Sequence, residues 1–412
     1  EEKGKETPDP LRQAGIVRGQ AIAKTQGSFD VVDVFAEVHV PVMEQLSLSA
    51  AVRVGDYSSV GSTTNWTLGF DAPISESFRL RGALATAVRA PNVSDLFAGG
   101  TATAALVVDP CNGITNADSG NVAENCRSVP AIQQRIDDTG AFTLTQVEAA
   151  NTSGLLSGST DVDEEKADTF TAGVVFTPES IPGLQMSFDY YDIKIEDAIA
   201  KTDRTVILNR CYSVSPGSFD ATCGGLVRRD NRAGAALDVN SASGNENIFE
   251  TKGLDIDVSY VTELYSGELY LGFAANILDT YDITGIETGD TQNLAGEVLF
   301  PELRFNINAS YAVNEFDIYW QLRYWDETKD RNDNTVLSDE LNSVDSRVYN
   351  DVRVSYNLTE NVNAYFGITN LFDEQPPSLT ANHKYQQEGT LTNGTAFDLT
   401  GRAYYAGIKV NF

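Results

Sequence analysis

Apolar and polar residues alternate along many short segments of this chain, and this feature limits its fold most. In segment 401–412, Tyr404, Ala406, Ile408, Val410 and Phe412 are apolar and alternate with mostly polar or small residues. Successive side chains of a β-strand point to opposite faces, so such a strand has one apolar and one polar face. The same pattern recurs in segments of about ten residues, the length of a tilted strand that crosses a bilayer. The pattern therefore predicts a sheet with one face in lipid.

Thirteen segments show this alternation, and all but the last pair up as hairpins. The predicted strands are 32–40, 46–54, 64–70, 78–88, 170–176, 184–195, 254–260, 269–275, 301–313, 316–325, 348–356, 362–368 and 401–412. In segment 184–195 the apolar residues change face between Tyr190 and Tyr191, and we expect a β-bulge there.

Short turns alternate along the chain with long connections, which is typical of outer-membrane barrels whose long loops face outside. The long connections are 91–166, 197–247, 279–300, 327–345 and 372–400. Alternation alone also fits the half-buried sheet of a soluble protein. Strand length, loop asymmetry and the terminal aromatic residue together favour an all-β fold, a transmembrane antiparallel β-barrel. No apolar run approaches the roughly 20 residues that a membrane helix needs.

An odd number of strands does not close a bacterial single-chain barrel, because such barrels have even strand numbers. An open sheet in lipid would leave unpaired backbone groups at its edges. We therefore expect residues 1–412 to be the C-terminal portion of a larger barrel, completed by an N-terminal polypeptide.

The formal net charge of -30 argues against nucleic acid as a partner, since binding a phosphate backbone needs a basic surface. Two acidic runs, Asp161 to Glu165 and Asp330 to Asp333, could hold calcium, which prefers clustered oxygen ligands. Asp339 and Glu340 lie close to the second run. Neither run has the spacing of an EF-hand. The alternative to a calcium site is that these acidic side chains are solvated in surface loops.

The four cysteines form two local pairs, Cys111 with Cys126 and Cys211 with Cys223, each in a polar stretch. This spacing predicts two small disulfide-closed loops in an oxidising compartment. A zinc site is the alternative, but CxxC spacing is missing and neither histidine lies near a pair.

Four stretches of the sequence resemble TonB-dependent outer-membrane receptors. They are FRLRGALATAVRAPNVSDLF at 78–97, EKADTFTAGVVF at 165–176, GITNLFDEQPP at 367–377 and the closing YYAGIKVNF at 404–412. Glu164 stands where the family usually has proline. The resemblance implies a 22-stranded barrel, of which these thirteen strands would be the last, with an N-terminal plug domain that is absent from this chain.

The resemblance also implies function and partners. A receptor of this family imports a scarce ligand, such as a ferric siderophore, carbohydrate, cobalamin or peptide, with energy from TonB of the inner membrane. TonB would act through the plug. Gly407, Ile408, Val410 and Phe412 are similar to the signal that the barrel-assembly machinery binds; their alternative role is to form the rim of the barrel.

Ligand contacts are expected on lumen-facing side chains at the outer ends of strands, which are accessible to water and held rigidly. The candidates are Arg89, Arg323, Trp325, Arg347 and Tyr349, because arginine and aromatic side chains suit sugars, carboxylates and anionic chelates. Alternatively, these arginines pair with nearby acids and hold the structure. A passive porin is the alternative function. The only two histidines, His39 and His383, supply no evident catalytic triad, so we do not expect an enzyme.

Overall fold

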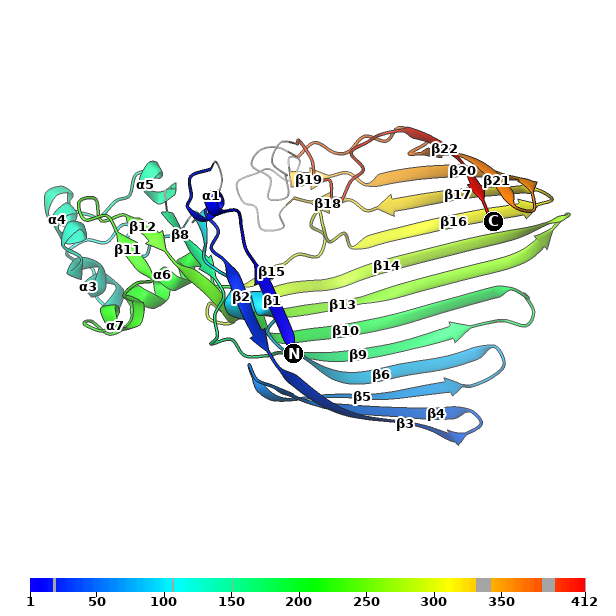
Figure 1. The fold of residues 1–412 in the computed structure, drawn as a ribbon, viewed down its shortest axis with the longest axis horizontal. Coiled ribbons are helices and arrows are strands. Elements are labelled where there is room, and N and C mark those ends of the chain that lie inside the picture. Colours follow the sequence, from blue (N-terminus) through cyan, green and yellow to red (C-terminus); the bar gives the residue numbers. More distant parts are fainter. Residues whose placement is uncertain (18–19, 106, 151, 331–341, 380–389, 412) are drawn as a thin grey trace.

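One large antiparallel sheet dominates the computed structural model of the chain (Figure 1). The structure describes residues 1–17, 20–105, 107–150, 152–330, 342–379 and 390–411. Within them, thirteen long strands follow each other in chain order and form the predicted hairpins. The long strands are β3 (Val31–Met43), β4 (Leu46–Tyr57), β5 (Gly61–Pro73), β6 (Phe78–Arg89), β9 (Glu165–Phe176), β10 (Leu184–Lys201), β13 (Ser241–Leu264), β14 (Gly267–Gly285), β16 (Leu303–Val313), β17 (Phe316–Trp325), β20 (Arg347–Thr359), β21 (Val362–Thr369) and β22 (Ala403–Val410).

Shorter elements lie in the connections and before β3. The short strands are β1 (Glu2–Glu6), β2 (Thr25–Phe29), β7 (Thr101–Ala105), β8 (Thr152–Ser157), β11 (Val227–Arg229), β12 (Ala236–Val239), β15 (Thr291–Asn293), β18 (Thr328–Lys329) and β19 (Ser343–Val344). The helices are α1 (Pro10–Gln13), α2 (Val93–Phe97), α3 (Asn121–Ser128), α4 (Pro130–Thr139), α5 (Gln146–Ala150), α6 (Arg204–Ser213) and α7 (Phe219–Cys223). Among the residues described, no helix has the length and apolar character needed to cross a membrane.

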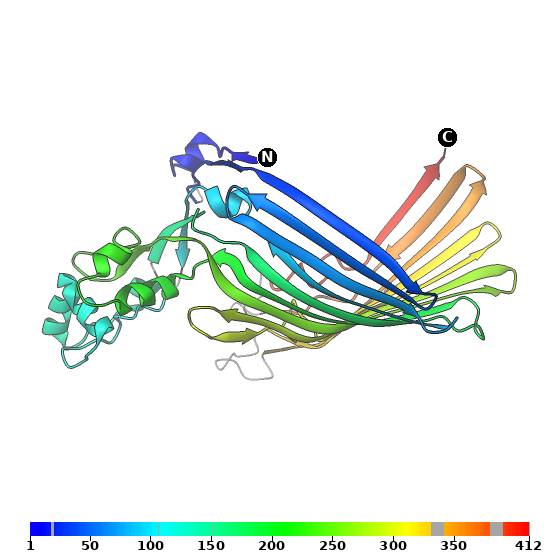
Figure 2. The ribbon, with the colours of Figure 1, turned by 90° about the horizontal axis from the view of Figure 1, so that it is seen from below.

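The main sheet curves into a trough whose two edge strands are β3 and β22. Around the sheet β22 is followed by β3. However, the register pairs of β22 are with β21, and those of β3 are with β4. No register pair in the described residues joins β22 to β3. Figure 2 shows the edge strands diverging. The side chains of β3 are exposed on both faces over most of the strand.

The convex face of the sheet is apolar and exposed, as predicted for a surface in lipid. On β22, Ile408 is 68% exposed, and on β3 Val38 is 52% exposed. The concave face carries charge instead: Arg81 of β6 reaches across β9 to Asp189 of β10, with nitrogen and oxygen 2.6 Å apart. This separation of an apolar outside from a polar inside is typical of a membrane barrel.

The predicted β-bulge between Tyr190 and Tyr191 is wrong. The register of β10 against β9 and β13 runs without interruption through both residues, and its irregularities lie later, between Ile195 and Ile199. Apolar residues therefore change sides: those up to Tyr190 face outward, and those from Tyr191 face the trough. Charged residues do the opposite: they face the trough up to Tyr190 and face outward beyond it. The strands therefore leave the apolar layer at this position.

This exchange explains why several strands are longer than predicted. The sequence predicted 254–260 and 269–275, whereas β13 covers Ser241–Leu264 and β14 covers Gly267–Gly285. Above the apolar layer the outward face becomes charged, so the membrane pattern ends while the backbone ladder continues. Parts of the predicted loops 197–247 and 279–300 are therefore strands.

The predicted difference between the two ends of the sheet is confirmed. Six short turns lie at one end, at 44–45, 74–77, 177–183, 265–266, 314–315 and 360–361. Five long connections lie at the other, at 90–164, 202–240, 286–302, 326–346 and 370–402. One short connection, 58–60, joins β4 to β5 at the long-loop end.

Two long connections, 90–164 and 202–240, fold together into a compact unit that we call the loop domain (Figure 1). The sequence predicted polar disulfide-closed loops here, yet α3, α4 and α6 pack around one buried apolar cluster. Ile132, Ile136, Phe142, Leu208 and Tyr212 are almost completely buried in it. Residues from both connections share the core, so neither could bury its apolar side chains alone.

Both predicted disulfides are confirmed, and both lie in this cluster. Cys111 and Cys126 have Cα atoms 5.5 Å apart, and those of Cys211 and Cys223 are 5.6 Å apart. Each bond closes a loop within one connection. Because all four sulfur atoms are buried against the same core, the disulfides restrict the unfolded connections and also fill the interior of the domain.

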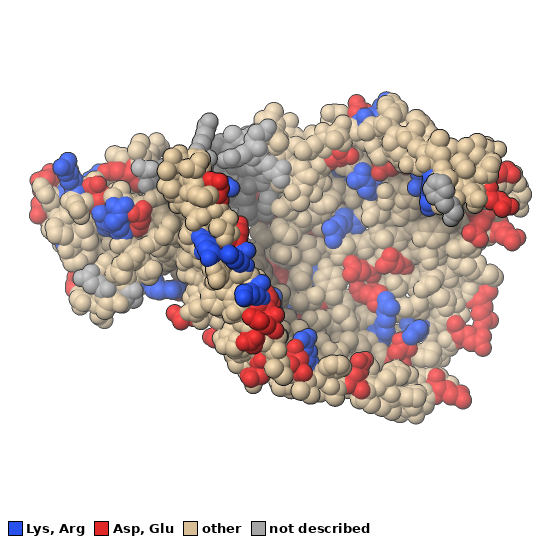
Figure 3. Space-filling view, viewed as in Figure 1, with Lys and Arg blue, Asp and Glu red and all other residues tan. Residues whose placement is uncertain are grey.

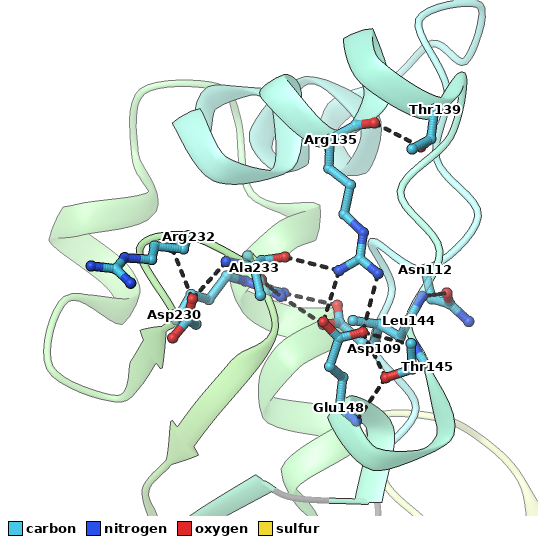
Figure 4. Close-up of polar contacts among 12 residues, drawn as sticks. Asp109, Asn112, Arg135, Thr139, Leu144, Thr145, Glu148, Asp230, Arg232 and Ala233 are labelled. Atoms are coloured by element: carbon cyan, nitrogen blue, oxygen red, sulfur yellow. Dashed lines mark hydrogen bonds and ion pairs between the residues drawn. The ribbon is translucent and has the colours of Figure 1, made fainter.

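Two arginines join the connections through polar contacts. Arg229 donates to both carboxylate oxygens of Asp109 at 2.6 and 2.8 Å, and only 6% and 1% of these side chains are exposed. Arg135 binds both oxygens of Glu148 and also donates to the carbonyl of Ala233 from the other connection (Figure 4). Paired, bidentate contacts of this kind satisfy charges that would otherwise be costly to bury.

The Glu148 carboxylate makes the loop domain sensitive to acid. Hydrogen bonds from Arg135, followed by those from Thr145, lower its pKa from 4.5 to about 2. A lowered carboxylate pKa stabilises the fold above the unfolded value and loses that contribution as pH falls. We expect the loop domain to open more readily as pH falls from about 4.5 towards 2. Hydrogen exchange corrected for its intrinsic pH dependence measures this. The Glu148→Gln variant should lack this part of the pH response, and an unchanged response would contradict the assignment.

Asp109→Asn tests the buried ion pair. The substitution keeps the side-chain size but leaves Arg229 buried without its counter-charge, which typically costs about 3–5 kcal/mol. Hydrogen exchange of α3, α4 and α6 should show local unfolding that is easier by this amount. The control is Asp138→Asn, at an exposed position of α4, which should change local stability by less than about 0.5 kcal/mol. Equal effects of the two substitutions would show that the pair does not hold the connections together.

Candidate functional site

Arg89, the first predicted ligand residue, holds the end of β6 to its neighbours. Its guanidinium donates two hydrogen bonds of 2.6 Å to Glu165 on β9 and one of 3.1 Å to Asp95 of α2. Asn92 caps α2 by accepting from the backbone of Ser94 and Asp95. The Arg-Ala-Pro-Asn stretch therefore ends a strand and begins a helix, and Arg89 connects this corner to β9.

Three other candidates, Arg323, Trp325 and Tyr349, lie together in a pocket of about 660 Å³ on the concave face. Strands β13, β14, β16, β17 and β20 form its wall, and part of the β21–β22 connection covers it. The side chains that contribute polar or aromatic groups are Asp255, Asp257, Asn276, Arg304, Asn306, Arg323, Trp325, Tyr349, Phe397 and Asp398.

The guanidinium of Arg323 is held over an aromatic ring. Its central carbon lies 5.1 Å from the ring centroid of Tyr349, which is a cation–π distance. Its Nη2 atom lies 3.4 Å from Asp351 and 3.9 Å from Asp398. These ion-pair distances are longer than the 2.7–2.9 Å or so of a charge-assisted hydrogen bond. The neighbours of Arg323 therefore hold its guanidinium in place but do not use all of its hydrogen-bonding capacity.

Trp325 marks the outer side of the pocket, where the β21–β22 connection folds inward. Its ring meets that of Phe397 edge-on, with centroids 6.3 Å apart. Phe397 is 3% exposed and packs with Val298, Val344 and Leu379, which come from three different connections. This second apolar cluster holds the cover of the pocket in place.

Two nitrogen atoms in the pocket are buried without a partner. Arg323 Nε and Trp325 Nε1 make no hydrogen bond to any residue that the structure describes. Arg304 is exposed on the same wall, and none of the described acids lies within ion-pair distance of it. A buried N–H without an acceptor costs about 1–3 kcal/mol, so these groups favour a ligand with oxygen acceptors.

Arg347, the remaining candidate, lies outside this pocket. It donates to the carbonyl oxygens of Asp345, Ser346 and Gln375, and it pairs with Glu374 at 3.4 Å. Only 16% of its side chain is exposed. The structure thus separates the five predicted residues: three share a pocket, while Arg89 and Arg347 connect strands to loops.

The sequence prediction missed several residues of the pocket. Arg304 shares the polar face of its strand, and that signal was available. Phe397 and Asp398 carry no such signal, because they lie in a long connection that returns to the sheet only in three dimensions. Asp398 donates its backbone N–H to the Tyr349 hydroxyl at 3.3 Å.

The described part of the chain contains no group of three or more His, Cys, Asp or Glu side chains that could hold a metal ion. In the run Asp161 to Glu165, the last carboxylate is bound by Arg89. Asp333 of the second predicted calcium run, the nearby Asp339 and Glu340, and also His383 lie outside the described residues.

The final strand places the predicted assembly residues on both faces. Ile408 and Val410 point outward and are exposed, whereas Gly407 lies beneath the Tyr365 ring, where a Cβ atom would come within 2.3 Å of the hydroxyl. Phe412 lies outside the described residues.

Comparison with known proteins matches residues 5–371 to the TonB dependent receptor-like β-barrel family. The chain belongs to the TonB-dependent receptor family. The family is one of outer-membrane transporters rather than enzymes, and it works with TonB. A search of the curated proteins found no match.

Solved structures of two receptors and an iron transporter share the fold. A double mutant of the ferric enterobactin receptor PfeA from Pseudomonas aeruginosa aligns with 94% of this chain at a TM-score of 0.62 and 16% identity. The siderophore receptor PirA from Acinetobacter baumannii aligns with 95% of it at 0.59 and 16%. The FrpB iron transporter from Neisseria meningitidis aligns with 98% at 0.53 and 13%. The chain spans about half the length of these receptors, at 46%, 46% and 48%.

Phe397→Ala tests whether the β21–β22 connection is fixed over the pocket. Loss of a buried phenylalanine typically costs about 3–5 kcal/mol. Hydrogen exchange of residues 390–398 should accelerate by several orders of magnitude. Phe372→Ala is the control: this side chain of the same connection is 69% exposed, and its loss should leave the exchange unchanged. Equal protection in wild type and Phe397→Ala would contradict the proposed anchor.

Proposed function

We propose that this chain forms the C-terminal part of the barrel of an active importer and supplies one side of its ligand site. An N-terminal part of the same receptor would provide the remaining strands of a 22-stranded barrel and the plug that TonB engages. The exposed edges of β3 and β22 support this, because unpaired backbone groups are costly in lipid.

The observation that carries the proposal is the arginine pocket inside the trough. Two guanidinium groups, an indole N–H without an acceptor and a buried tyrosine face a polar cavity of about 660 Å³. Such a site suits a ligand with several anionic or carbonyl oxygens and a planar surface. A ferric siderophore fits this chemistry better than the carbohydrate, cobalamin or peptide alternatives. PirA is named a siderophore receptor and PfeA a ferric enterobactin receptor, which supports the same choice.

The predicted ligand residues then divide into two groups. Arg323, Trp325 and Tyr349 contact the ligand, together with Arg304. Arg89 and Arg347 position the surrounding strands, because their donors are already used. Asp398 competes with the ligand for Arg323, so binding displaces a weak ion pair rather than a strong one. Gly407, Ile408, Val410 and Phe412 serve barrel assembly.

Arg323→Ala in the full-length receptor tests this proposal. Removal of a charged hydrogen-bond donor typically costs about 1.5–3 kcal/mol, so the Kd of a ferric tricatecholate or ferric citrate chelate should rise by about 10- to 100-fold. Titration calorimetry measures the Kd, and iron uptake with and without TonB measures energy coupling.

Arg353→Ala is a matched control for this experiment. Arg353 also faces the trough, lies 5.6 Å from the Tyr319 ring centroid and 3.8 Å from Asp317, but it does not line the pocket. Its loss should leave the Kd unchanged. Equal effects of both substitutions would contradict the pocket assignment, and uptake that is independent of TonB would favour a passive porin.

A further inference from the structure

Two rows of side chains that face the trough close to the long-loop end are mostly apolar. Each row crosses β6, β9, β10, β13 and β14 through consecutive register pairs. The upper row is Ala87, Ala167, Ile195, Phe249 and Ile283, and the lower row is Ala85, Thr169, Ile193, Thr251 and Tyr281. We call these rows the vestibule wall.

The vestibule wall lies where the sheet has left the membrane. At this level the opposite, convex face carries charge, for example Asp168, Lys194, Glu250 and Asp282 in one row. Nearer the turns the arrangement is reversed, with Arg81 and Asp189 inside and apolar residues outside. A charged outer surface cannot lie in hydrocarbon, so this part of the sheet is outside the membrane. Contact with lipid therefore does not explain why its inner face is apolar.

The wall is accessible to solvent within the part of the chain that the structure describes. Its aliphatic and aromatic side chains are half-buried, and Ala87 is exposed. Figure 3 looks into the trough and shows charged side chains on its surface towards the turn end. Exposed apolar surface in a concave site commonly marks a place of binding.

The vestibule wall is continuous with the arginine pocket. Tyr191, two residues from Ile193 along β10 and on the same face, accepts a hydrogen bond of 3.1 Å from Asn276. Asn276 lines the pocket and also donates to Asp255 at 2.9 Å. The site therefore has an arginine-rich polar end and an apolar end, joined through Tyr191.

We propose that the imported ligand is amphiphilic: an anionic chelate head lies in the arginine pocket, and an aliphatic tail lies along the vestibule wall. This inference rests on the proposed function and adds the class of substrate. The wall favours a tail over a second charged group because no charged side chain interrupts its two rows. Contact with Ile193, Ile195 and Phe249 would remove the tail from water, so each buried CH₂ group would tighten binding.

The test uses two probes with the full-length receptor. One is a ferric citrate–hydroxamate chelate that carries an acyl tail, and the other is the same chelate without the tail. Titration calorimetry below the micelle concentration of the acylated probe gives both Kd values. We expect the acylated probe to bind at least about tenfold more tightly, and Ile193→Ser with Phe249→Ser to remove most of this difference.

Ile248→Ser is the matched control, since Ile248 is adjacent to Phe249 on β13 and points to the opposite face. It should leave both Kd values unchanged. Ile193→Leu, which keeps the wall apolar, should retain the preference for the tail. A loss of preference in Ile248→Ser as well would show a general effect on the barrel and overturn the wall assignment.

The outcomes separate this inference from the proposed function. Equal affinity for the two probes, with both weakened by Arg323→Ala, would leave the arginine pocket intact and overturn the amphiphilic ligand. It would also indicate that another segment of the receptor covers the wall. Binding of neither probe would overturn the anionic-ligand function itself. A tail preference that survives Ile193→Ser and Phe249→Ser would place the tail elsewhere and contradict the proposal.

Discussion

Backbone hydrogen bonding in a medium without water is the constraint on which the rest of this structure depends. In hydrocarbon each strand must satisfy its N–H and C=O groups through its neighbours, so the chain forms one continuous antiparallel ladder. The ladder fixes which side chains are inside and outside along thirteen strands. In the part of the chain that the structure describes, no register pair joins β3 to β22, which is why further strands are part of the proposed receptor.

The exchange of polarity at Tyr190 and Tyr191 shows how far the membrane extends along the sheet. Below it, the outside is apolar and the lumen is charged. Above it, the strands continue as a rigid wall in water, and their inner face is free to become apolar. The candidate pocket lies next to this boundary, where β13 to β20 are held by their ladders and by the Phe397 cluster. The same hydrogen-bonded ladder that satisfies the backbone in lipid thus provides a rigid surface for ligand recognition.

The loop domain solves a different physical problem, because a loop in water has no lipid to cover its apolar residues. Two connections that leave the sheet at different strands combine their few apolar residues into one core around the disulfides. The buried pair of Arg229 and Asp109 adds stability only while both partners are present. The shared core and this ion pair therefore couple the stability of the two connections.

The sequence by itself determined the strands, their hairpins, the loop asymmetry, the two disulfides and the family. Each of these depends on patterns within a few residues, such as the alternation in 316–325 or the short spacing of Cys211 and Cys223. Tertiary structure alone decided that α3, α4 and α6 share a core, that β13 and β14 extend beyond the membrane, and that Phe397 and Asp398 return to Arg323 and Trp325. Those features depend on contacts between segments far apart in the chain. Such contacts produce no periodic pattern in the local sequence of either segment.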